Sequence, residues 1–120
     1  MSALGRYRVI YEVADVVGSC PIYKKGDKVV IDPAEADQEV SIINLKETDA
    51  VCTRILGTTL LSYFMFFQVA KEEELHEKYH TIKGGVHWSR CTEPGKPYTK
   101  RGYVTFRIYR EPYQPEVDGQ

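Results

Sequence analysis

One stretch of the sequence, Leu60 to Val69, is apolar on almost every side and carries four aromatic residues. It is far too short to cross a bilayer, which takes about 20 residues, so it predicts a buried helix. Consecutive residues point around the full circumference of a helix, and four of them here are the large apolar residues Phe64, Met65, Phe66 and Phe67. We therefore expect this helix to lie at the centre of the domain or to be covered by another chain.

Two other segments alternate apolar and polar residues with the period of two that is typical of a half-buried strand. Tyr103 to Tyr109 has the cleaner pattern, and Tyr7 to Val13 the second. Ile10 breaks the alternation in the latter, so its second face is also expected to be covered. Lys28 to Asp32 follows a tight turn and predicts a further strand, since its centre is continuously apolar.

The remaining segments are less regular. Val40 to Leu45 fits either a short strand or a helical turn, and both readings stay open. Thr48 or Asp49 can cap the start of the helix, because a short side-chain oxygen satisfies its free amide donors. That helix continues to His80, and Val86 to Cys91 is expected to be another strand.

The order of these segments predicts an α+β fold, with a small antiparallel or mixed sheet and one main helix packed on one face. A length of 120 residues fits one domain. We assign residues 1–110 to a single α+β domain and residues 111–120, which contain two prolines, to an extended C-terminal tail.

The overall charge argues against two classes of partner. Sixteen basic and seventeen acidic residues leave a net charge of −1, so neither nucleic acid nor a membrane is expected as a partner. The N-terminus lacks an apolar signal core. Three widely spaced cysteines make a poor disulfide framework and suit a reducing compartment. These features predict a cytoplasmic protein.

The segment His76-Glu77-Lys78-Tyr79-His80 matches the H-E-x-x-H pattern of zinc peptidases. Two histidines four residues apart share a helix face and can bind one zinc ion, with the glutamate as general base. A third ligand is not at the expected spacing, because His87 lies one residue too far along. A solvated helix end is therefore the favoured interpretation, and no catalytic residue is predicted.

The three cysteines are the second candidate metal site. Cys20, Cys52 and Cys91 fall at a turn, a helix start and a strand end, which a compact sheet can bring together. His87 shares a strand face with Cys91 and completes a Cys3His set suited to zinc. The chain lacks a C-x-x-C clip, so three separate buried thiols are the alternative.

Several short motifs together resemble an uncharacterised family of small three-cysteine α+β proteins of anaerobes and archaea. The motifs that carry the likeness are Val17-Gly18-Ser19-Cys20-Pro21, Gly26-Asp27, Cys52, Trp88 with Cys91, and Val104-Thr105-Phe106-Arg107-Ile108. The resemblance implies the order of elements and the three cysteine positions, and no activity. In size the chain is also similar to the gamma subunit of acetophenone-carboxylase-type enzymes.

Three functions from different classes follow. The leading interpretation is a small non-catalytic subunit of a larger multi-subunit metabolic enzyme complex, bound to larger protein subunits and carrying a structural zinc. An ATP-dependent carboxylase of ketone or aromatic degradation is the example that the second resemblance suggests. The alternative is a stand-alone thiol or metal protein that binds zinc or an iron–sulfur cluster. A minimal zinc hydrolase using His76, Glu77 and His80 ranks last.

Overall fold

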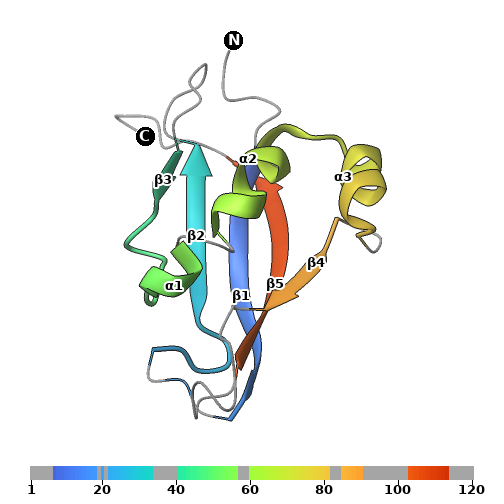
Figure 1. The fold of residues 1–120 in the computed structure, drawn as a ribbon. Coiled ribbons are helices and arrows are strands. Elements are labelled where there is room, and N and C mark those ends of the chain that lie inside the picture. Colours follow the sequence, from blue (N-terminus) through green and yellow to red (C-terminus); the bar gives the residue numbers. More distant parts are fainter. Residues whose placement is uncertain are drawn as a thin grey trace, which may run out of the picture.

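The computed structural model describes residues 7–18, 20, 22–33, 41–56, 60–81, 85–90 and 103–113. Within these residues the chain forms an antiparallel sheet with helical segments against one face (Figure 1). The α+β prediction is confirmed at this level. Of the two sheet types that the sequence left open, the structure has the antiparallel one.

Five strands make up the sheet, in the order β3-β2-β1-β5-β4. Their bounds are β1 Tyr7–Val17, β2 Lys28–Pro33, β3 Ser41–Ile43, β4 His87–Arg90 and β5 Tyr103–Pro112. All neighbouring strands run antiparallel. The short strands β3 and β4 therefore lie at the two edges, and β1 lies at the centre.

The central pair of strands is longer than the sequence pattern predicted. β1 continues four residues past Val13 because it stays paired with β5 through a register shift between Val13 and Asp15. Such a shift accommodates one extra residue, so the apolar–polar alternation does not continue in step beyond it. β5 likewise continues to Pro112, so Glu111 and Pro112 belong to the sheet and pair with Arg8 and Tyr7.

The core lies between the sheet and the helical segments. Alternate residues of β1 and β5 point to this side and are almost completely buried, among them Val9, Tyr11, Phe106 and Ile108. Burial of one such side chain stabilises the fold by roughly 1.5–3 kcal/mol. The hydroxyl of Tyr11 donates a hydrogen bond of 3.0 Å to the backbone carbonyl of Leu60, which satisfies its one polar atom.

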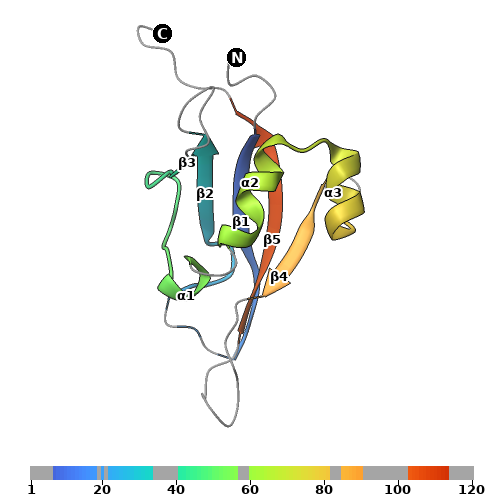
Figure 2. The same cartoon turned by 45° about the horizontal axis from the view of Figure 1, so that its top comes forward.

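In place of one main helix, the structure has three helical segments, α1 Thr53–Ile55, α2 Leu61–Val69 and α3 Glu72–Tyr79. Figures 1 and 2 show α2 across β1 and β5, and α3 beside β4. The prediction of a single helix is therefore too simple. Among the residues that the structure describes, no helix is long and apolar enough to cross a membrane.

The helical region also begins later than predicted, because the expected capping residues accept hydrogen bonds from amides of the sheet. Thr48 Oγ1 accepts a hydrogen bond of 2.9 Å from the Val30 amide, and Asp49 Oδ2 accepts one of 2.8 Å from the Lys28 amide. Both side chains thus satisfy donors of β2. The residue before α1 is Cys52, whose side chain makes no capping hydrogen bond.

Arg110 of β5 fixes the end of α2. Its guanidinium donates hydrogen bonds to the backbone carbonyls of Phe67 and Ala70, and it stacks 3.9 Å from the centre of the Tyr7 ring. A cation at a helix C-terminus satisfies free carbonyls and complements the helix dipole. The chain then turns through Lys71, whose amide donates to Glu74 Oε1 at 2.8 Å and starts α3.

Candidate functional site

Two of the predicted metal ligands, Cys20 and Cys52, lie on either side of Tyr23. The Tyr23 amide donates to Cys20 Sγ at 3.4 Å, and the Cys52 amide donates to the Tyr23 hydroxyl at 3.0 Å. That hydroxyl in turn donates to the Ala50 carbonyl at 3.0 Å. Both cysteines are half-buried and unpaired thiols. Cys91, the third predicted ligand, lies outside the described residues.

The fourth predicted ligand, His87, lies in an aromatic cluster between β4 and the helices. Its ring centre is 5.0 Å from that of Tyr63 and 5.3 Å from that of Tyr79. Burial lowers the pKa of His87, while a hydrogen bond to the Tyr79 backbone carbonyl raises it by less. Across 7–18, 20, 22–33, 41–56, 60–81, 85–90 and 103–113, no three His, Cys, Asp or Glu residues form a group able to hold a metal ion.

The H-E-x-x-H segment spans the end of α3. Glu77 and His76 are exposed, and Nδ1 of His76 is 2.7 Å from the carbonyl of Thr81, to which it donates. His80 lies beyond the last helical residue and has left-handed backbone angles, with φ of 55°. The backbone therefore leaves the helix at the second histidine, and the two histidines are not presented by one continuous helical turn.

Two buried tyrosines, Tyr11 and Tyr23, have perturbed pKa values. Burial raises the pKa of Tyr23 to about 12 and raises that of Tyr11 still further. Each hydroxyl donates to a backbone carbonyl, Ala50 for Tyr23 and Leu60 for Tyr11. Both side chains therefore stay protonated near neutral pH and act as structural donors.

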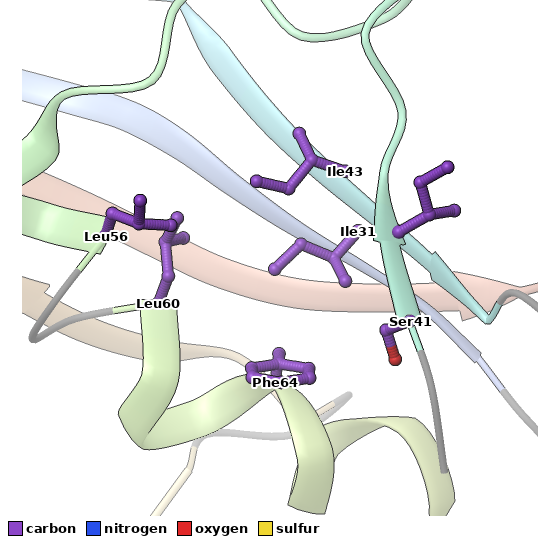
Figure 3. A pocket seen from close by; sticks show the side chains of 7 residues that line it. Ile31, Ser41, Ile43, Leu56, Leu60 and Phe64 are labelled. Carbon is purple, nitrogen blue, oxygen red and sulfur yellow. The ribbon is translucent and has the colours of Figure 1, made fainter. Parts of the chain in front are cut away.

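The feature that the sequence did not predict is an apolar groove at the β3 edge of the sheet (Figure 3). It is an open hollow of about 130 Å³. Ile31 of β2, Ile43 of β3 and Leu60 point into it from facing sides. The described residues that line it are Ile31, Ser41, Ile42, Ile43, Leu56, Leu60 and Phe64.

Polar atoms take little part in this groove. The hydroxyl of Ser41 is already engaged, since it donates a hydrogen bond of 2.8 Å to Gln68 Oε1 on α2. The groove therefore suits an apolar group, and none of the described lining residues carries a charge. Its only sequence signal was the apolar segment Val40 to Leu45, which fitted a strand and a helical turn equally well.

Large apolar side chains are also exposed among the residues of the groove and next to them in the sequence. Ile42 is 58% exposed and Leu56 is 40% exposed, and both line it. Leu45, two residues beyond β3, is 78% exposed. Single exposed apolar residues are common on protein surfaces, whereas a cluster that borders a hollow indicates a contact site.

Comparison of the chain with protein-family models, with curated proteins and with solved structures finds no match.

Proposed function

We propose that this chain is a small non-catalytic subunit that works by binding a larger protein partner in an enzyme complex. The observation that carries this proposal is the apolar groove at β3, with Leu56 exposed at its rim and Ile42 exposed on the other face of the same edge strand. An exposed apolar surface costs free energy in water, about 25 cal/mol per Å², and contact with a partner removes that cost. An ATP-dependent carboxylase is the first complex to test, because the size resemblance suggests it.

The predicted helix Leu60 to Val69 bears on the same proposal, because four consecutive large apolar residues point around its full circumference. Phe67 is fully buried in the core, and Phe64 is half-buried at the groove. The side chains of Met65 and Phe66 lie outside the described part of the structure. The expectation that this chain alone cannot bury all four residues therefore remains a prediction.

Purification of the chain from its native cells at endogenous level tests the proposal. A subunit should elute from a sizing column far above the mass of one 120-residue chain, with the same partner subunits in fixed stoichiometry after each step. A free monomer in the native extract would contradict it. Recombinant chain analysed by sedimentation is the control, because it separates self-association from binding to other subunits.

A second candidate, a thiol or metal protein, is favoured by the placement of Cys20 and Cys52 around one tyrosine. Metal analysis of the purified chain and a thermal melt with and without a chelator test it. A zinc site that includes these thiols predicts one zinc per chain and a lower melting temperature with chelator. Cys20→Ser should then abolish both, whereas a metal-free chain with a chelator-insensitive melt would exclude this function.

A further inference from the structure

The backbone of β3 offers hydrogen-bonding groups on its outer side. In an antiparallel pair, directly opposed residues alternate between those that exchange hydrogen bonds and those that do not. Asn44 donates to the Val30 carbonyl at 2.8 Å, and the register pairs Ile42 with Asp32 and Ile43 with Ile31. Ile42 therefore bonds to β2. Ser41 and Ile43 instead direct their amide and carbonyl groups away from it.

No described strand pairs with this outer side, because β3 ends the sheet order. The side chains of Ser41 and Ile43 point to the helix side of the sheet, into the groove. Ile42 borders the groove as the residue between them, but its side chain points to the other face, because side chains alternate along a strand. A strand added beside β3 would thus gain backbone hydrogen bonds and an apolar hollow for its side chains at the same place.

The size of the hollow fits one medium-sized apolar side chain. An engineered apolar cavity of about 150 Å³ in another protein holds a benzene molecule, and this groove measures about 130 Å³. The side chain of leucine, isoleucine or phenylalanine is of that scale. A chain added to β3 also places its alternate residues against exposed Ile42, so both faces of the added strand meet apolar surface.

The extent of the edge argues against a second copy of this chain as the occupant. β3 has three residues, which at about 3.3 Å each is a contact only about 10 Å long. A stable protein–protein interface buries about 800 Å² on each partner, far more than two such edges can provide. A short extended segment of a larger protein, held elsewhere by its own contacts, matches the edge better.

We propose that an extended apolar segment of a partner protein adds to the sheet as a strand antiparallel to β3, with one side chain in the groove. This inference rests on the proposed function and specifies its docking site. The segment exchanges hydrogen bonds with Ser41 and Ile43. The residues of the partner segment that lie opposite Ser41 and Ile43 are apolar. The residue between them, which contacts Ile42, is apolar as well.

A defined peptide tests this geometry on the complete chain. The probe is acetyl-Lys-Thr-Leu-Val-Leu-Thr-Lys-amide, in which both leucines face the helix side of the sheet, with one of them in the groove, and the valine faces Ile42. Nuclear magnetic resonance titration should shift the amide signals of Ser41 and Ile43, which gain hydrogen bonds, more than that of Ile42, which is already bonded to β2. Methylation of both leucine amide nitrogens should abolish binding, while methylation of the valine nitrogen should leave it.

Matched variants separate the edge from the groove. Ser41→Pro removes the outward amide and Ser41→Ala keeps it, although both lose the hydroxyl contact to Gln68. Loss of one backbone hydrogen bond should weaken peptide binding about fivefold to tenfold in the proline variant only. Leu56→Asp should weaken binding by adding a charge at the groove rim, whereas the volume-conserving Leu56→Met should not.

Equal binding by Ser41→Pro and Ser41→Ala, or by both methylated peptides, would overturn strand addition. So would the absence of a saturable shift up to the solubility limit of the peptide. The proposed function fails separately. If native partners still co-purify with Ser41→Pro, the docking site is wrong and the subunit function stands. If the peptide binds as predicted but the chain is a free monomer in native extracts, the docking site is right and the subunit function is wrong.

Discussion

The helical layer covers the two halves of the sheet to different degrees. Over β1 and β5 it is tightly packed, and Phe67, Leu75 and Phe106 are completely buried. Over β2 and β3 the same layer leaves an open apolar groove between Leu56, Phe64 and the edge strand (Figure 3). Both regions are built from the same residue types, so their composition does not distinguish a core from a contact site. The difference lies in how completely the opposite layer covers them.

The packed half also has its helix end fixed by a side chain from the sheet, since Arg110 takes the last carbonyls of α2. Before the other end of α2, Leu56 and Leu60 line the groove, and Leu56 remains 40% exposed there. Substitutions in the packed half should therefore lower stability. Substitutions in the groove half should mainly change binding.

The largest effect is expected from Phe106→Ala. Phe106 is fully buried and its ring packs edge-on against Tyr23, with centres 5.5 Å apart. Removal of the ring leaves a cavity and should lower the free energy of unfolding by about 3–5 kcal/mol. Urea denaturation followed by circular dichroism measures this, with Phe106→Leu as a milder control. A loss below about 1 kcal/mol would show that this half is not the tightly packed one.

Arg110→Met should have the next largest effect. It leaves the carbonyls of Phe67 and Ala70 without their donor and removes the contact with Tyr7, and hydrogen bonds to charged groups contribute about 1.5–3 kcal/mol. Arg107→Met is the matched control, because Arg107 forms an ion pair with Glu12 at 2.6 Å in which both side chains are partly exposed to solvent. That pair should contribute about 1 kcal/mol or less. Equal losses in the two variants would contradict a special role for Arg110.

A smaller and pH-dependent effect is expected at His87. Burial lowers its pKa in the folded chain, so the unfolded chain binds the proton more readily. The neutral ring therefore stabilises the fold above the ordinary histidine pKa of about 6.5, and this contribution is lost as the pH falls through that range. Melting temperatures at neutral and mildly acidic pH measure it. His87→Gln should flatten the profile, and an unchanged profile in this variant would contradict the assignment to His87.

The smallest effect on stability is expected from Leu56→Ser in the groove. Leu56 is already 40% exposed, so the free energy of unfolding should change by about 0.5 kcal/mol or less. Association with the native partner should nevertheless weaken. Parallel denaturation and pull-down measurements separate these two outcomes. A large loss of stability would place Leu56 in the packed core and remove the contrast between the two halves.

Sequence patterns predicted the parts of the fold that depend on local alternation. Val104, Phe106 and Ile108 share a face because side chains alternate along a strand, and all three are buried as the pattern indicated. The helix boundaries were not predictable in this way. Thr48 and Asp49 look like helix caps, but whether they bind helix or strand amides depends on which donors the folded sheet places beside them.

The candidate site was less accessible to sequence reasoning. The groove lies between Leu56, Leu60 and Phe64 on one side and Ile31 and Ile43 on the other, an arrangement that depends on tertiary packing and not on any motif. For the predicted metal ligands, a sequence pattern was present but did not determine which residues lie together. Cys20 and Cys52 do lie around Tyr23, but His87 lies in the cluster of Tyr63 and Tyr79. A shared strand face with Cys91 could not reveal that His87 packs among aromatic rings.

Amide hydrogen exchange of the chain, alone and in its native complex, tests the contrast between the two halves most directly. In the isolated chain the amides of Ser41 and Ile43 should exchange rapidly, while those of Tyr11 and Ile108, in the central strands, should be protected. In the complex, Ser41 and Ile43 should become protected and the central strands should change little. Unchanged exchange at Ser41 and Ile43 in a complex that is demonstrably formed would contradict the assignment of β3 and its groove as the docking site.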